Sequence, residues 1–348
     1  MPASNSDDAT RKRCTESFET GSDRDLRKFK PAMSVFNTLR LVGQILLARP
    51  VRLGVIGILC GIFFIREMPG ARRSSQDGRS VTLYVSVLDK AGRPIDKLTK
   101  QDFTVLEQDK PQVITTLEFE KDTPVSLGVL IDVSRGMGVE SINLALSWLT
   151  TVAKTLRSPD EIFVNAFSDE SQEVVDYISP EDYLAEALDH LGTGGQARMG
   201  LAVDLALIKL REARNSKRAL LMLSAGRDIA GPATLDHISK FGFPIYAVGV
   251  PGSSGATGTL DRLKNLNLRG SALRVYAEHS GGEALFVQSV VEGEEAIARI
   301  CHQMKNQYRL DYTSGSSAKP GKMLKVEVKT RFPDWDVRYL KKYPVTSR

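Results

Sequence analysis

The segment VSLGVLIDVSRGM, Val125 to Met137, decides the fold of this 348-residue chain. It runs an apolar stretch directly into a short polar loop that begins with Asp132 and Ser134. Such a stretch is typical of a strand that is buried on both faces of a parallel sheet, where ligands bind beyond the carboxyl ends of the strands. A carboxylate and a hydroxyl two residues apart can both turn toward one hard cation, but Gly136 supplies no side-chain oxygen.

The middle of the chain continues this alternation of apolar strands and amphipathic helices. Strands are predicted in five further segments: 161–169, 173–179, 218–226, 244–250 and 283–288. Helices are predicted over 140–156, 181–190, 197–212, 260–279 and 292–307. Because strands such as ALLML at 219–223 are apolar throughout, helices must cover both faces of the sheet. The pattern therefore predicts a doubly wound, mostly parallel, Rossmann-like α/β domain.

The flanking segments switch to a period of two, which is typical of strands with one buried face. VTLYVSVLD at 81–89 is followed by two strands around a QDKP turn within 102–119. Three strands alone bury too little apolar surface to be stable, and the C-terminal segments 308–313, 323–330 and 336–345 alternate in the same way. We therefore predict one β-sandwich-like domain built from residues 80–119 and 309–348, with the α/β domain, 120–308, inserted between them.

The first 79 residues are predicted to direct or anchor the chain. Residues 1–32 are polar without apolar periodicity, which indicates a disordered tail or a start codon placed too early, with Met33 as the true start. Residues 33–68 contain the 13-residue apolar run LGVIGILCGIFFI, short for a membrane span and typical of a signal-peptide core. A cleaved signal, an uncleaved anchor and a buried helix all remain open. Residues 69–79 are predicted to be a linker, and we favour export, with the body outside the cytoplasm.

Composition excludes several other classes of function. Residues 1–75 carry 13 Lys and Arg against 7 Asp and Glu, and the rest of the chain carries 34 against 35, so the body is nearly neutral. Nucleic-acid binding is not expected without a basic patch. The three cysteines form no CxxC motif, and the four histidines show no zinc-ligand spacing. Neither a phosphate-binding fingerprint in the loop 249–258 nor a nucleophile elbow occurs, and Asp169 with Glu170 are interpreted as a solvated surface.

The ordered set of motifs resembles a von Willebrand factor type A (VWFA) domain. The resemblance is carried by VLIDVSRGM, the GTGGQA loop, LLMLSAG, YAVGV followed by LRVYAEHSGGEALFV, and EAIARICHQMKNQYRLDYT. The preceding segment, VTLYVSVLDKAGRPIDKLTKQDFTVLEQDKPQVITTLEF, resembles that of the VWFA-related proteins common in acidobacteria. Together the match spans roughly residues 80–345.

The resemblance implies a metal-ion-dependent adhesion site (MIDAS), at which Mg²⁺ bridges the domain to an acidic side chain of a partner. Asp132 and Ser134 match the family motif, but Gly136 replaces its second serine. Gln196 stands where a threonine is expected, three residues after Thr193, and Ala225 replaces an aspartate, with Asp228 three residues later. The candidate metal ligands are therefore Asp132, Ser134, Gln196 and Asp228, a degenerate set that predicts weak Mg²⁺ binding at most. The alternative is that Asp132 and Ser134 serve only as loop and helix-cap residues.

The function expected from these observations is protein–protein interaction through the upper loops of the α/β domain, in an exported or membrane-anchored, non-enzymatic protein of the cell envelope. The protein partner is not identified by the sequence. Two alternatives stay open: an enzyme of doubly wound fold that binds a phosphorylated ligand, and a purely structural envelope protein.

Overall fold

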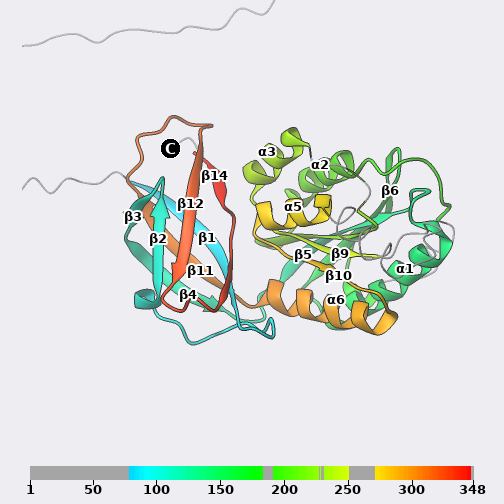
Figure 1. Cartoon of the computed structure of the whole chain (residues 1–348), viewed down its shortest axis with the longest axis horizontal. Coiled ribbons are helices and arrows are strands. Elements are labelled where there is room, and N and C mark those ends of the chain that lie inside the picture. The colour runs from blue at the N-terminus through cyan, green and yellow to red at the C-terminus, as the bar shows by residue number, and fades with distance from the viewer. Residues whose placement is uncertain (1–77, 183–190, 227, 229–230, 251–270, 346–348) are drawn as a thin grey trace, which may run out of the picture. The chain divides into compact units, whose positions relative to one another are not determined.

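The computed structural model describes residues 78–182, 191–226, 228, 231–250 and 271–345 (Figure 1). The chain divides into two units, 1–71 and 72–348, and all described residues belong to the second. The predicted tail, the apolar segment, nearly all of the linker, most of the helix 181–190 and the first part of the helix 260–279 lie outside the described residues. Within the described ranges, no helix is both long and apolar enough to cross a bilayer.

The middle of the chain folds around a six-stranded sheet. Its strands are β5 (Val125–Asp132), β6 (Glu161–Phe167), β7 (Ser171–Ile178), β8 (Lys217–Ser224), β9 (Ile245–Gly249) and β10 (Ala284–Phe286). The spatial order is β10-β9-β8-β5-β6-β7, and all neighbours are parallel except β6 and β7. Every residue of β5 is buried, as predicted for a strand with helices on both sides. The doubly wound, mostly parallel fold is confirmed.

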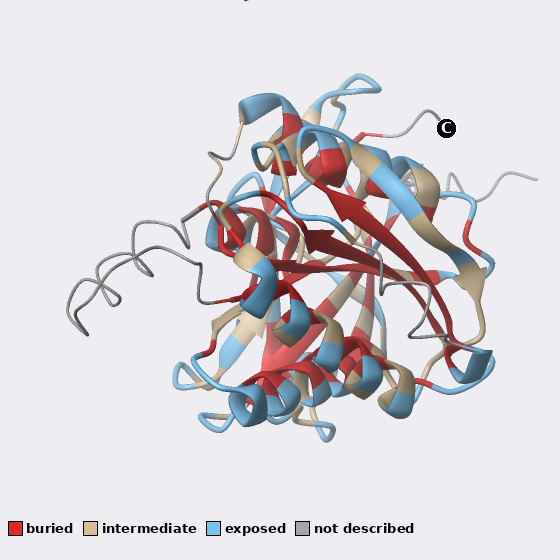
Figure 2. Ribbon diagram, turned by 90° about the vertical axis from the view of Figure 1, so that its right-hand side faces the viewer, coloured by how far each residue is buried: buried red, intermediate tan, exposed pale blue. Residues whose placement is uncertain are grey.

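Helices cover both faces of this sheet (Figures 1 and 2). On one face lie α1 (Gly138–Thr155) and α6 (Val290–Lys305), whose core includes the fully buried Trp148. On the other lie α2 (Met199–Leu210), α3 (Pro232–Phe241) and α5 (Ser271–Ser280). The outer faces of the helices are largely exposed, whereas β5, β6, β8 and β9 between them are almost entirely buried.

The sequence analysis missed α3. Its signals were present, because Pro232 occupies the first turn and Gly242 ends the helix in the left-handed conformation at φ 73°. The helix has only 10 residues and buries three of them, Thr234, Ile238 and Ser239, so only one of its fully apolar side chains is buried. The caps rather than the apolar pattern identify this helix.

Strands from the two ends of the described chain form two further antiparallel sheets. The first has the order β13-β1-β11-β4 and contains β1 (Arg79–Leu88), β4 (Ile114–Glu120), β11 (Gln307–Ser314) and β13 (Asp336–Arg338). The second has the order β14-β12-β2-β3 and contains β2 (Phe103–Glu107), β3 (Lys110–Gln112), β12 (Met323–Thr330) and β14 (Lys342–Pro344). Because β11 pairs with both β1 and β4, and β12 with β2, the predicted pairing of the terminal segments is confirmed. One apolar core contains residues of both sheets.

Two predicted strands of this domain are divided in the structure. The segment after the turn at Gln108 and Asp109 was expected to be one strand, but Val113, 81% exposed, separates β3 from β4 in the other sheet. The segment 336–345 is likewise divided into β13 and β14, again in different sheets. A period of two shows which residues face the core, but it does not show where the chain crosses between sheets.

Candidate functional site

The carboxylate of Asp132 is fully buried at the end of β5, and both of its oxygens accept hydrogen bonds from the protein. Oδ1 accepts from the backbone N–H of Ser134 at 2.9 Å, which is an Asx-type turn. Oδ2 accepts from the hydroxyl of Ser224, the last residue of β8, at 2.6 Å. The Ser224 oxygen in turn accepts from the backbone N–H of Gly226 at 2.9 Å. Asp132 thus ties the loop after β5 to the loop after β8.

The second loop closes onto the first through backbone hydrogen bonds. The N–H of Gly194 donates to the carbonyl of Val133 at 3.0 Å, and the N–H of Arg135 donates to the carbonyl of Gly195 at 3.2 Å. The backbone N–H of Gln196 donates to Oδ1 of Asp169 at 3.0 Å, while Gln196 itself is exposed. The structure therefore brings the first two loops together, as the resemblance implies.

Asp228, the acidic residue expected to replace the missing aspartate at Ala225, lies at the amino end of α2. Its Oδ2 accepts hydrogen bonds from the backbone N–H groups of Met199, at 2.8 Å, and Gly200, at 3.4 Å. These N–H groups have no partner within the helix, and the helix dipole favours a negative charge there. The carboxylate of Asp228 therefore stabilises the start of α2.

A Mg²⁺ ion fits this arrangement poorly. Within the described ranges, no three or more His, Cys, Asp or Glu side chains are grouped so that they could hold a metal ion. A cation at Asp132 would have to compete with the Ser134 N–H and the Ser224 hydroxyl for the carboxylate, with no further acid from position 225. Mg²⁺ requires near-octahedral oxygen geometry. We therefore still predict that any Mg²⁺ binding at Asp132, Ser134, Gln196 and Asp228 is weak.

Calorimetric titration with Mg²⁺ and Mn²⁺ tests this prediction. We expect no saturable heat up to millimolar metal, because the Asp132 oxygens already accept two strong hydrogen bonds. Ser224→Ala removes one of these donors without adding a ligand and serves as the comparison. Stoichiometric binding at micromolar metal that disappears in Asp132→Asn would contradict the expectation and establish a cation site.

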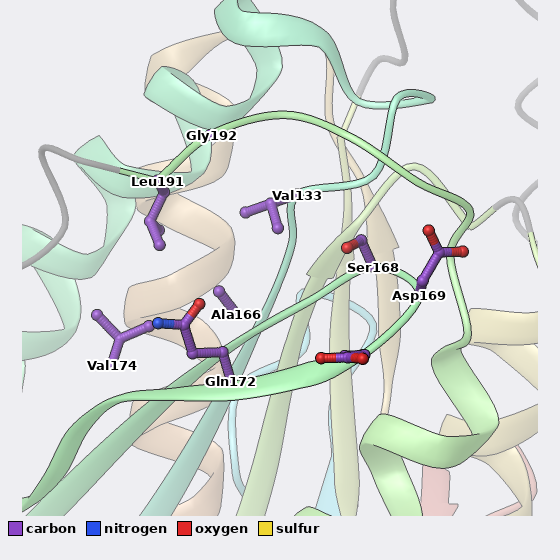
Figure 3. A pocket seen from close by; sticks show the side chains of 9 residues that line it. Val133, Ala166, Ser168, Asp169, Gln172, Val174, Leu191 and Gly192 are labelled. Carbon is purple, nitrogen blue, oxygen red and sulfur yellow. The ribbon is translucent and has the colours of Figure 1, made fainter. Parts of the chain in front are cut away.

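A cavity of about 500 Å³ lies beside these loops, between the ends of β5 and β6, β7 and the start of the second loop (Figure 3). One side is mainly apolar but also carries the amide of Gln172, and the other side carries hydroxyl and carboxylate groups. The apolar side is formed by Val133, Ala166, Val174 and Leu191, and the polar side by Ser168, Asp169 and Glu170. Gln172 and Gly192 complete the lining. The cavity therefore combines an apolar wall with negative charge at its rim.

The sequence analysis treated Asp169 and Glu170 as a solvated surface, and both are exposed. It did not reveal that Asp169 holds the Gln196 backbone, or that both residues border a cavity. Gly195 has a positive φ of 66°, and a Cβ at this position would clash with the carboxylate of Asp169, which gives a physical reason for this glycine of the GTGGQA loop. Of the loop 249–258, which lacks a phosphate-binding fingerprint, only Gly249 and Val250 lie within the described residues.

Comparison with known proteins gives one family and several solved structures. A family model for the von Willebrand factor type A domain matches residues 127–289, whereas no curated protein matches the chain. An aerotolerance-related membrane protein from Bacteroides fragilis is 18% identical, with 51% of this chain and 98% of that chain covered and a TM-score of 0.39. A von Willebrand factor type A protein from Catenulispora acidiphila is 11% identical, with 72% and 74% covered and a TM-score of 0.43.

The family match and the observed topology concern the same residues. The matched range begins at the third residue of β5 and extends past β10, so it contains the six-stranded sheet except for Val125 and Ser126, together with α1, α2, α3 and α5. Residues 127–289 of this chain therefore form a von Willebrand factor type A domain.

Proposed function

We propose that this chain is a non-catalytic protein-binding module of the cell envelope, exported or held at a membrane by its N-terminal region, which binds a protein partner through the loops at the carboxyl ends of β5, β6 and β8. The single observation that carries the proposal is the cavity beside the Asp132 loop, which joins an apolar wall to the carboxylates of Asp169 and Glu170.

The chemistry of this cavity favours a basic side chain of the partner. A lysine or arginine has an apolar stem, which suits the wall formed by Val133, Val174 and Leu191, and a cationic head, which suits the carboxylates at the rim. Recognition would then rely on the protein's own negative charge, whereas the family's metal site recruits an acidic side chain. Charge at the rim contributes mainly to the rate and specificity of association.

A comparison of two charge-reversal variants tests this function. We expect that immobilised wild-type protein captures a specific set of proteins from envelope extracts, and that Glu170→Lys lowers their recovery about tenfold, which corresponds to about 1.4 kcal/mol of binding free energy. Quantitative mass spectrometry measures the recovery. Increasing the salt concentration from 0.1 to 0.5 M should also lower the recovery, because the higher ionic strength shortens the Debye length and screens the attraction between opposite charges.

The matched control is Glu294→Lys, which makes the same charge change at an exposed position on α6, outside the cavity. Asp169 is left unchanged because it supports the loop at Gln196. Equal recovery by the wild type and both variants would refute a role for the cavity.

A further inference from the structure

The α/β domain and the β domain have separate apolar cores. The two clusters of buried apolar residues around the six-stranded sheet contain only residues from the range 125–304. The third cluster contains only residues from 81–119 and 308–345. In the described part of the chain, no apolar cluster therefore includes residues of both domains. Domains that are not joined by a large apolar interface are expected to move relative to each other.

The chain passes between the two domains twice, and the two connections lie side by side. The first is the segment 121–124, between β4 and β5, and the second is Asn306, between α6 and β11. The N–H of Thr123 donates to the carbonyl of Lys305 at 3.3 Å, so the connections are adjacent. Asp122 has a φ of 50°, in the left-handed region that residues other than glycine seldom adopt. A pair of adjacent connections defines one axis, which is the geometry of a hinge.

An ion pair joins the domains at a distance from this hinge. The parallel strands β5, β8, β9 and β10 are neighbours in this order, so their amino ends lie along one edge of the sheet. At about 4.8 Å per strand, β10 lies about 14 Å from β5 and the hinge. Glu283 immediately precedes β10, and its Oε2 lies 2.8 Å from Nη1 of Arg338, the last residue of β13. Both side chains are largely buried, at 6% and 17% exposed.

A glycine beside this ion pair lets the backbones of the two domains approach closely. Gly281 has a φ of 84°, and a Cβ atom there would lie 2.3 Å from the carbonyl carbon of Tyr339, which follows β13. This turn belongs to the motif LRVYAEHSGGEALFV, to which the proposed binding function gives no role. We call the two contacts, Glu283 with Arg338 and Gly281 with Tyr339, the latch.

Between the hinge and the latch, α6 buries an amide that has no hydrogen-bond partner. A Cβ atom at Gly92, in the loop after β1, would lie 2.2 Å from Cζ of Arg299, so Arg299 touches the β domain. Gln307 Nε2 donates to Oγ of Ser86 in β1 at 2.9 Å. Gln303 lies one helical turn after Arg299 and is fully buried, and neither amide atom has a partner within the described residues. An unpaired buried amide raises the free energy of the closed junction.

We propose that the α/β domain rotates about the paired connections between a closed state, in which the latch is formed, and an open state, in which Glu283 separates from Arg338 and water reaches Gln303. Each charge of the latch keeps a partner in its own domain, because Glu283 also pairs with Arg299, and Nε of Arg338 donates to Asp336 at 2.8 Å. Opening therefore avoids the cost of isolating a buried charge. The rotation changes the direction in which the upper loops face relative to the residues before β1, whichever partner these loops bind.

Pulsed electron spin resonance on the full chain in detergent micelles measures the two states. Spin labels are attached at Ala233→Cys on α3 and Lys325→Cys on β12, both exposed positions, one in each domain. Cys14→Ser and Cys60→Ser form the background, since Cys301 is fully buried. We expect two populations of distances between the labels, and their ratio gives the proportion of open to closed molecules.

Three substitutions at the junction should change this ratio in defined directions. Arg338→Met keeps the apolar stem but removes the charge, and Glu283→Gln keeps the shape, so each should raise the open-to-closed ratio about tenfold. Gln303→Met replaces the unpaired amide by an apolar group of similar shape. When it is added to Arg338→Met, the ratio should fall again by about fivefold.

The matched control is Arg331→Met, which removes an ion pair within the β domain. Arg331 lies 2.7 Å from Asp102, whose carboxylate is as buried as that of Glu283, at 6% exposed. This variant should leave the ratio unchanged. A single distance population that is the same in the wild type, Arg338→Met and Glu283→Gln would overturn the hinge. Equal shifts in Arg331→Met and Arg338→Met would overturn the latch, because the effect would then be general loosening.

Discussion

Gly293→Ala is expected to destabilise the protein by about 3 kcal/mol, at the upper end of the usual range for overpacking. A Cβ atom at this position in α6 would lie 1.9 Å from Cε2 of Trp148 and 2.3 Å from its Nε1. The indole is fully buried and its Nε1–H donates to the carbonyl of Val290 at 3.1 Å, so the ring cannot move away from the added methyl group without losing packing or this hydrogen bond. Helix propensity alone predicts the opposite sign, a gain of about 1 kcal/mol. Urea unfolding, monitored by tryptophan fluorescence, distinguishes the loss of stability expected from overpacking from the gain expected from helix propensity.

Gly315→Ala is the matched control, because no heavy atom lies within 4 Å of the added Cβ. We expect it to change the free energy of unfolding by less than about 0.5 kcal/mol. The double variant Gly293→Ala with Trp148→Phe should recover part of the loss, since the smaller ring leaves space for the new methyl group. If Gly293→Ala stabilises the protein, the close packing of α1 against α6 is incorrect.

Asp160→Ala is expected to cost about 3–5 kcal/mol, as is typical when one partner of a buried ion pair is removed. Asp160 is fully buried where three segments meet. Its carboxylate accepts from the backbone N–H of Val125 at 2.9 Å and of Arg157 at 3.0 Å, and pairs with Nζ of Lys305 at 2.7 Å. Removal of the carboxylate leaves two N–H groups and a mostly buried ammonium without this acceptor. Urea unfolding again measures the loss.

Asp160→Asn should give an intermediate loss, because the amide preserves the shape and one acceptor but not the charge. Asp334→Ala removes a carboxylate that pairs with Lys90 at 3.7 Å on the surface, where both side chains are more than 70% exposed, and should cost less than about 0.5 kcal/mol. Equal losses for Asp160→Ala and Asp334→Ala would mean that the buried network contributes little to stability.

Much of the α/β domain was predictable because its signals are local. The apolar run VSLGVLIDV at 125–133 and the helical period at 140–156 arise from residues that lie close together in the chain. The structure contains both elements, within two residues of the prediction at each end. In the β domain, local alternation predicted the strands but not the changes of sheet at Val113 and after Arg338. These changes depend on which distant strand offers a free edge.

The candidate site was likewise predictable only where its signals are local. The sequence alone indicated that Asp132 and Ser134 follow a buried strand. It also indicated that the usual metal-binding residues are replaced at three positions, by Gly136, Gln196 and Ala225. It could not indicate that Asp132 accepts a hydrogen bond from Ser224, that Asp228 stabilises the start of α2, or that Asp169 and Glu170 border a cavity.

The amino-acid sequence by itself determined the fold class of this protein and the position of the Asp132 loop at the end of a buried strand, because periodicity and turn chemistry act over a few residues. Only the tertiary structure decided which groups the polar side chains of these loops bind, and that Glu283 pairs with Arg338 of the β domain. Partners such as Asp132 and Ser224 are separated by 92 positions in the chain, and their contact depends on how the strands are ordered in the sheet. That order is set by the packing of the whole domain rather than by any one segment.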